Sequence, residues 1–114
     1  MHKVPVLLLT TTGRKTGRKR TTPLLYIRDG NRLVIVASNG GRAIDPSWWM
    51  NLKRNPIAMV QVKDVKQTIY AQRAIGSEKE RLWRLMTSVY PAYDDYQKKT
   101  DRDIQVVVLM PKTS

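Results

Sequence analysis

Few side chains in this chain of 114 residues could carry out chemistry unaided. The absence of cysteine excludes a thiolate zinc site, an iron–sulfur cluster, a disulfide scaffold and a cysteine nucleophile. The single histidine, His2, stands at a terminus that we expect to be frayed, which argues against a histidine-based triad or metal site. The carboxylate pairs Asp94/Asp95 and Asp101/Asp103 lie among polar residues typical of solvated turns and caps. An enzyme of this composition would need a cofactor, and we expect no bound metal.

The charge of the chain indicates what kind of ligand to expect. The formal net charge is +12, and five cations fall within the seven residues Arg14–Arg20. A nucleic-acid patch, an anionic lipid surface and a pocket for an anionic small molecule all fit this run, as does a solvated loop. The run lacks the glycine–lysine spacing of a P-loop and precedes a strand, so a nucleotide site of that type is excluded.

Two aromatic clusters could line a site. Ser47-Trp48-Trp49-Met50 opens a predicted helix, and adjacent tryptophans cannot both face one core, so we expect one of them to line a cleft. The alternative is one buried and one half-exposed tryptophan. Tyr90, Tyr93 and Tyr96 recur every three residues and share one helix face, where they form either core packing or a polar pocket wall.

The elements that must position these residues are mostly strands. Apolar and β-branched runs predict six strands, at 4–12, 21–28, 32–38, 56–63, 67–75 and 104–110. The basic run would connect the first two strands as a hairpin loop, and Pro23 places the second strand at an edge or bulge. Asp29-Gly30-Asn31 and Asp64-Val65-Lys66 are the other predicted hairpin turns.

Three short helices complete the prediction. The first is capped by Asp45, with Pro46 as its first residue, and runs to about Arg54. The second opens on the capping box Ser77–Glu80 and runs to about Val89, with Leu82, Leu85, Met86 and Val89 on its apolar face. The third follows Pro91 and ends near Lys98. The whole chain, 1–114, is predicted to be a single α+β barrel domain.

The residues also match a known family in four ordered motifs. These are Leu7–Gly17 with Arg20–Leu24; Ala37-Ser38 with Gly40-Gly41; Pro46–Pro56; and Tyr90–Tyr96 with Thr100–Arg102. Together they resemble the deazaflavin-dependent nitroreductases and quinone reductases of actinobacteria, chiefly mycobacteria, which use coenzyme F420. The resemblance runs from about Val6 to Leu109. It implies a split β-barrel similar to the FMN-binding barrel of pyridoxamine-phosphate oxidases.

The resemblance further implies where the cofactor lies. The phosphate and acidic tail would contact Arg14, Lys15 and Thr16, and the stretch beside the phosphate and ring would be Arg20, Thr21, Thr22, Pro23, Leu24 and Leu25. The walls around the deazaflavin would be Val36, Ala37, Ser38, Asn39, Ser47, Trp48, Trp49, Met50 and Asn51, with Tyr93 near the ring and substrate.

For activity, the resemblance implies hydride transfer from reduced F420 to a quinone, nitro compound or activated enone. The protein then needs neutral donors for the negative charge that builds on the acceptor, and a phenol stays protonated at pH 7. The candidates are Tyr93, Tyr90, Tyr96 and Ser38.

Two alternatives remain at this stage: a basic nucleic-acid-binding barrel, and a flavin or F420 carrier without catalysis. No apolar run is long enough for a membrane span, so we expect a cytoplasmic protein, a monomer or homodimer, for which peripheral membrane contact is open.

Overall fold

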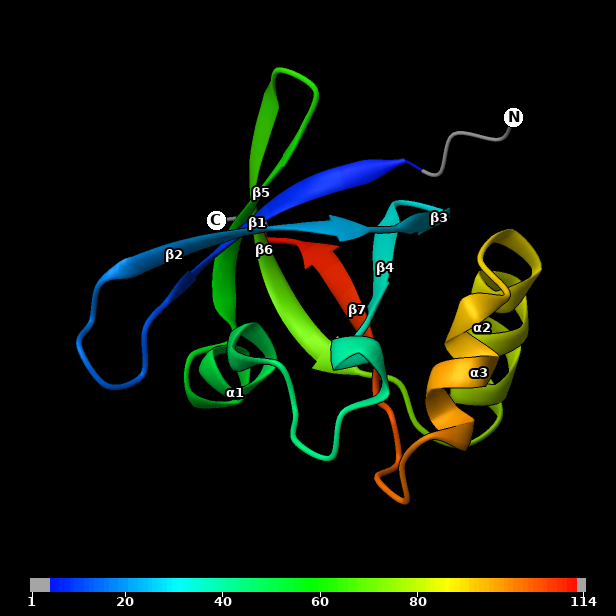
Figure 1. Cartoon of the computed structure of the whole chain (residues 1–114). Coiled ribbons are helices and arrows are strands. Elements are labelled where there is room, and N and C mark those ends of the chain that lie inside the picture. Colours follow the sequence, from blue (N-terminus) through cyan, green and yellow to red (C-terminus); the bar gives the residue numbers. More distant parts are fainter. Residues whose placement is uncertain (1–4, 113–114) are drawn as a thin grey trace.

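The computed structural model describes residues 5–112, so His2 and Val4 lie outside the described part. Its strands are β1 (Val6–Thr12), β2 (Lys19–Leu25), β3 (Ile27–Asp29), β4 (Arg32–Val36), β5 (Ile57–Val62), β6 (Val65–Arg73) and β7 (Val106–Pro111). They form one antiparallel sheet in the order β2-β1-β5-β6-β7-β4-β3. Because β2 and β3 are consecutive in the chain yet lie at opposite ends of this order, the sheet curls into a half-barrel (Figure 1). This confirms the predicted split-barrel class.

The strand sequences explain two separate hydrophobic cores. β1 alternates, with Leu7 and Leu9 buried and its other apolar side chains facing outward. β4 and β7 are buried on both faces: Leu33 and Ile35 pack into the barrel core, whereas Val34 and Val36 pack into a second core beneath the helices. This double burial is why both strands read as unbroken apolar runs in the sequence.

One predicted strand is two strands in the structure. The segment 21–28 divides at Tyr26, whose N–H donates to the Pro5 carbonyl at 3.2 Å while its ring is buried. The break lets β3 leave the β1–β2 ladder and pair with β4 instead. The edge position of Pro23 is confirmed, since β2 is the last strand of the sheet and Pro23 lies opposite Leu8.

The predicted turn between β5 and β6 was placed wrongly by the sequence pattern. Val62 pairs with Val65, which leaves only Lys63 and Asp64 as the turn, and Lys63 takes a positive φ of 56°. The two valines continue the ladder one step further than the polar character of the neighbouring residues indicated.

The helices are α1 (Ser47–Arg54), α2 (Gly76–Val89) and α3 (Ala92–Lys98), with a short 3₁₀ turn η1 at Asn39–Gly41. Both predicted side-chain caps were wrong. Pro46 occupies the cap position of α1, because the Asp45 carboxylate binds Arg102 and Lys53 instead. α2 begins at Gly76 with Ile75 in the cap position, so Ser77 is already inside the helix. Among residues 5–112, no helix is long and apolar enough to cross a bilayer.

The apolar face of α2 is narrower than predicted. Leu82 and Met86 are fully buried, but Leu85 and Val89 are 39% and 42% exposed. The second contact row is supplied by Trp83, which packs against Tyr93 of α3 with ring centroids 6.5 Å apart. α2 therefore carries α3 on one flank rather than lying flat on the sheet, as Figure 1 shows for this helix pair.

Ion pairs tie α2 to the β3–β4 hairpin. The Asp29 carboxylate accepts hydrogen bonds from Arg81, at 2.9 Å, and from Arg32, which also pairs with Glu78 at 2.8 Å. The guanidinium groups of Arg81 and Arg32 lower the pKa of the Asp29 carboxyl to about 2. The hairpin and the helix thus stay linked at any physiological pH.

Candidate active site

A basic cleft lies between the β1–β2 hairpin and the start of α1. Its volume is about 680 Å³. It is lined by Thr11, Gly13, Arg14, Lys15, Thr16, Lys19, Arg20, Thr21, Thr22, Ser47, Trp48 and Asn51. Four of these side chains are cationic and none is acidic, so the cleft suits a polyanion.

An aromatic cleft adjoins it, of about 520 Å³. Its lining residues come from β2, the end of β4, η1, α1 and α3: Thr22, Pro23, Leu24, Leu25, Val36, Ser38, Asn39, Gly40, Pro46, Ser47, Trp48, Tyr90, Tyr93 and Tyr96. Thr22, Ser47 and Trp48 belong to both clefts, which makes the two continuous. Apolar walls with a few hydroxyl and amide groups are typical of a site for a flat heterocycle.

Asn51 fixes the basic loop onto α1. Its side chain is only 3% exposed; Oδ1 accepts from the Arg14 N–H at 3.2 Å and from Arg14 Nη1 at 2.9 Å, and Nδ2 donates to Thr11 Oγ1 at 3.1 Å. Arg14 Nη1 also donates to Ser47 Oγ at 3.1 Å. Arg14 therefore joins the basic loop to α1 through these hydrogen bonds. Lys15 and Arg20, in contrast, are exposed cations at the edge of the cleft.

Tyr90, Tyr93 and Tyr96 form one wall of the aromatic cleft, but the prediction that they share one helix face was wrong. Tyr90 is the C-terminal cap residue of α2, because the chain breaks there before Pro91, and only Tyr93 and Tyr96 lie on α3. The Tyr93 ring is 5% exposed and meets Tyr90 and Tyr96 edge-on, at centroid distances of 4.9 and 6.0 Å. Burial raises the pKa of Tyr93 to about 12, and the hydrogen bond between the Tyr90 and Tyr96 hydroxyls, 3.4 Å apart, raises the pKa of Tyr90. Both phenols are therefore neutral donors at physiological pH.

This wall requires η1 to lie close against α3, and Gly41 makes that close approach possible. Gly41 has a φ of +80°, and a Cβ there would lie 2.7 Å from the Tyr96 carbonyl oxygen. No other residue type permits η1 and α3 to approach so closely. In the sequence, Gly41 was noted only as part of a motif, and no structural role was predicted for it.

The structure brings together most of the predicted site residues and leaves three aside. Ala37 is fully buried in the barrel core, and Trp49 is buried beneath Lys53, whose Nζ lies 5.8 Å from the ring centroid. Met50 is half-buried on α1. None of the three lines either cleft, and cofactor contacts at these positions remain predictions. Trp48 is the member of the tryptophan pair that reaches the cleft.

Sequence reasoning missed Arg102, whose side chain holds the loop between β4 and α1. Arg102 was noted only as part of the motif Thr100–Arg102, and no role was predicted for it. A signal was present: a single arginine just before the apolar β7 strand is costly to bury unless it is fully hydrogen-bonded. Among residues 5–112, no three His, Asp or Glu side chains gather as a metal site would require.

Both the sequence and the structure are similar to those of known proteins. Residues 1–111 match the family described as F420H(2)-dependent quinone reductase. An F420H(2)-dependent quinone reductase of Mycobacterium tuberculosis is 42% identical over 108 residues, which cover 92% of this chain and 72% of that protein. The structure of an F420-H2-dependent reductase, FDR-A, is 40% identical with a TM-score of 0.84, covering 96% of this chain and 98% of that one. A solved domain-swapped dimer is also 40% identical, with a TM-score of 0.85, covering 95% and 81%.

Proposed function

The chain belongs to the F420H(2)-dependent quinone reductase family, and from that membership we propose how its two clefts divide the work. The protein is an oxidoreductase whose cofactor is coenzyme F420. When bound and reduced, this cofactor supplies a hydride to a quinone acceptor. We propose that the basic cleft holds the phosphate and acidic tail, and that the aromatic cleft holds the deazaflavin ring.

The continuity of the two clefts carries this proposal. A ligand with a polyanionic end and a flat apolar end needs two unlike surfaces in contact, and Trp48 with Ser47 and Thr22 forms that junction. The exposed cations Lys15 and Arg20 would steer and orient the tail. Burial of the ring against Trp48 and the β2 side chains would supply more of the affinity than any one exposed cation.

The neutral hydroxyls of the aromatic cleft have the chemistry that the acceptor requires. A quinone gains negative charge on its oxygen as it accepts a hydride, and a donor already in place stabilises that charge. Tyr93 is the foremost candidate, because its ring is fixed by edge-on packing against Tyr90 and Tyr96 and its side chain lines the aromatic cleft. Ser38, Tyr90 and Tyr96 line the same cleft as further donors, and nitro compounds or activated enones are further candidate acceptors.

The division between the clefts is tested by comparing Arg20→Ala with Arg18→Ala. Both variants remove one exposed cation from the basic run Arg14–Arg20, but only Arg20 lines the basic cleft. We expect Arg20→Ala to raise the Kd for oxidised F420 about threefold to tenfold, and Arg18→Ala to change it less than twofold. Tryptophan quenching during titration at constant ionic strength measures both values.

A deazaflavin that lacks the phosphate and acidic tail completes this experiment. Neither variant should alter its Kd, since the ring would lie in the aromatic cleft. Equal weakening of F420 binding by both variants would mean that the basic run attracts the cofactor only through its overall charge, without a specific contact from Arg20. Loss of affinity for the tail-free compound in Arg20→Ala would contradict the proposed placement.

The role of Tyr93 is tested by Tyr93→Phe, with Tyr70→Phe on the 45% exposed outer face as the control. We expect kcat for quinone reduction to fall about tenfold or more in Tyr93→Phe, while the Kd for F420 changes less than twofold. Because the pKa of Tyr93 is about 12, its phenol does not ionise between pH 6 and 9, and kcat should show no ionisation of Tyr93 there. Unchanged turnover would remove Tyr93 from the mechanism.

We also propose that the protein forms a homodimer, as the 40%-identical domain-swapped dimer does. The outward face of β1, β5, β6 and β7 supports this, because it carries partly exposed apolar side chains, with Tyr70 directly opposite Met110. They are Val6, Leu8, Met59, Tyr70 and Met110. Light scattering of the purified protein measures its mass directly.

The comparisons support neither the nucleic-acid-binding nor the carrier alternative. Cytoplasmic location and membrane contact stay predictions.

A further inference from the structure

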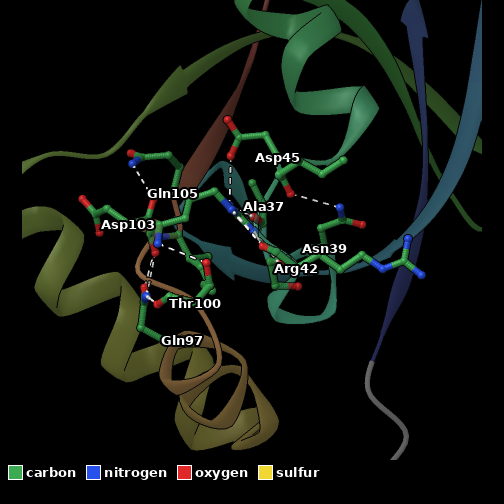
Figure 2. A network of polar contacts seen from close by, with 12 residues as sticks. Ala37, Asn39, Arg42, Asp45, Gln97, Thr100, Asp103 and Gln105 are labelled. Atoms are coloured by element: carbon green, nitrogen blue, oxygen red, sulfur yellow. Dashed lines mark hydrogen bonds and ion pairs between the residues drawn. The ribbon is translucent and has the colours of Figure 1, made fainter.

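Arg102 places its entire guanidinium group against the loop between β4 and α1. Nη1 donates to the Ala37 carbonyl at 3.0 Å and to Asp45 Oδ1 at 2.9 Å. Nη2 donates to the carbonyls of Ser38, at 2.8 Å, and Arg42, at 3.1 Å, and Nε donates to Arg42 at 3.2 Å. Figure 2 shows Ala37, Arg42 and Asp45 gathered around this point. Three carbonyls and one carboxylate are thus bound by one side chain.

The guanidinium is itself held in place. The side chain is 13% exposed, and the Asp45 carboxylate that neutralises it also pairs with Lys53 of α1 at 3.3 Å. The Arg102 N–H donates to Thr100 Oγ1 at 3.1 Å, and its carbonyl accepts from Gln97 Nε2 at 2.7 Å. Gln97 belongs to α3, the helix that carries Tyr93 and Tyr96, so Arg102 links the loop between β4 and α1 to the helix that supplies these tyrosines.

The loop that Arg102 holds cannot keep its shape by local preference alone. Asn39, Gly40 and Gly41 have φ values of 47°, 63° and 80°, three successive residues in the left-handed region. Asn39 is not a glycine, and such a conformation persists only where surrounding contacts impose it. Ser38, Asn39 and Gly40 are also lining residues of the aromatic cleft.

We propose that Arg102 is a positioning residue, which shapes the Ser38–Gly40 wall and thereby sets how tightly the aromatic cleft binds a deazaflavin ring. The proposal rests on the proposed function, because it takes the ring to occupy that cleft. Arg102 touches neither ring nor acceptor; it acts through the backbone of residues 37–42. Lysine cannot replace it, since one ammonium presents its donors from a single point and cannot span carbonyls on both sides of the loop.

The test measures binding of the tail-free deazaflavin and of oxidised F420 to wild type, Arg102→Ala and Arg102→Lys. We expect the Kd of both compounds to rise about tenfold in each variant, in contrast to Arg20→Ala, which affects F420 alone. Asp45→Asn is the matched control: it keeps an oxygen acceptor for Nη1 and all three carbonyl bonds, and its Kd should rise less than threefold.

Chemical rescue separates positioning from a general loss of structure. Guanidinium chloride at about 20 mM should recover most of the lost ring affinity in Arg102→Ala, and ammonium chloride at the same concentration should not. If Arg102→Ala does not fold, Arg102→Lys gives the result through amide hydrogen exchange: residues 38–42 should exchange at least tenfold faster than in wild type, with the β-strand amides unchanged.

Two failures are distinguishable. If the wild-type protein binds F420 or the tail-free compound no better than an unrelated basic barrel, the proposed function fails. If the wild type binds both and the folded Arg102 variants bind the ring within twofold of it, the inference about Arg102 alone is overturned. Equal rescue by guanidinium and ammonium would also overturn it.

Discussion

Replacing Gly41 with alanine is expected to lower the free energy of unfolding by about 2–4 kcal/mol. The new Cβ would lie 2.7 Å from the Tyr96 carbonyl oxygen and 3.0 Å from its Cα, both backbone atoms that cannot rotate away. The left-handed conformation adds about 1 kcal/mol for any residue with a side chain, and overpacking adds about 1–3 kcal/mol. Relief requires α3 to move away from η1, which displaces the tyrosine wall. Urea unfolding monitored by tryptophan fluorescence measures the loss.

Gly40→Ala is the matched control for this prediction. Gly40 is the preceding residue and has a similar φ of +63°, but no heavy atom lies within 4 Å of the Cβ that would be added. Its destabilisation should therefore be limited to the conformational cost of about 1 kcal/mol. Equal effects at the two positions would mean that the contact between η1 and α3 is looser than the structure places it.

Trp48→Leu is expected to raise the Kd for F420 at least tenfold. Trp48 lines both clefts but is only 7% exposed, so the effect comes less from its contact area than from the wall that it forms. Leucine would leave a void where the two clefts meet, and truncating a packed aromatic residue at the centre of a binding site commonly costs about 2 kcal/mol or more of binding free energy. A tenfold change in Kd corresponds to about 1.4 kcal/mol. The variant also loses packing against Trp49, which it meets edge-on with centroids 6.5 Å apart. Isothermal titration calorimetry measures the Kd without depending on tryptophan emission.

Trp49→Leu separates this binding effect from general destabilisation. Trp49 is 5% exposed, close to the 7% of Trp48, and belongs to the same barrel core, so the two variants should lose similar free energies of unfolding. Only Trp48 lines a cleft, and the Kd of Trp49→Leu should stay within threefold of wild type. Comparable weakening in both variants would instead support the sequence-based expectation that the whole Trp48–Met50 stretch contacts the cofactor.

Features governed by neighbours in the sequence were predictable. The β1–β2 hairpin, the turn between β3 and β4, and the shared face of Tyr93 and Tyr96 on α3 all follow from periodicity and turn chemistry over a few residues. The predicted cap at Asp45 failed because residues distant in the sequence bind its carboxylate. Asp45 is taken by Arg102 and Lys53, and distant partners of this kind override a local preference that is worth about 1 kcal/mol.

The site itself combines local and distant determinants. The basic run, the tryptophan pair and the tyrosines predicted its chemical character, and most residues of the motifs line two adjoining clefts, where their contacts with a cofactor remain predictions. Which tryptophan faces the cleft could not be read from Trp48-Trp49, because either choice satisfies helical geometry. Both rings belong to the barrel core, so the expectation that adjacent tryptophans cannot share one core was wrong, and of the two only Trp48 also lines the clefts.

The sequence by itself determined the composition of the site: a small α+β domain without thiols, a polycationic hairpin, and three closely spaced phenols. Only the tertiary structure decided that Asn51 fastens Arg14, 37 residues away, and that Arg102 binds the Ala37 carbonyl across 65 residues. Backbone carbonyls occur at every position and carry no sequence signature. The partner of a buried guanidinium therefore becomes known only once the chain has folded around it.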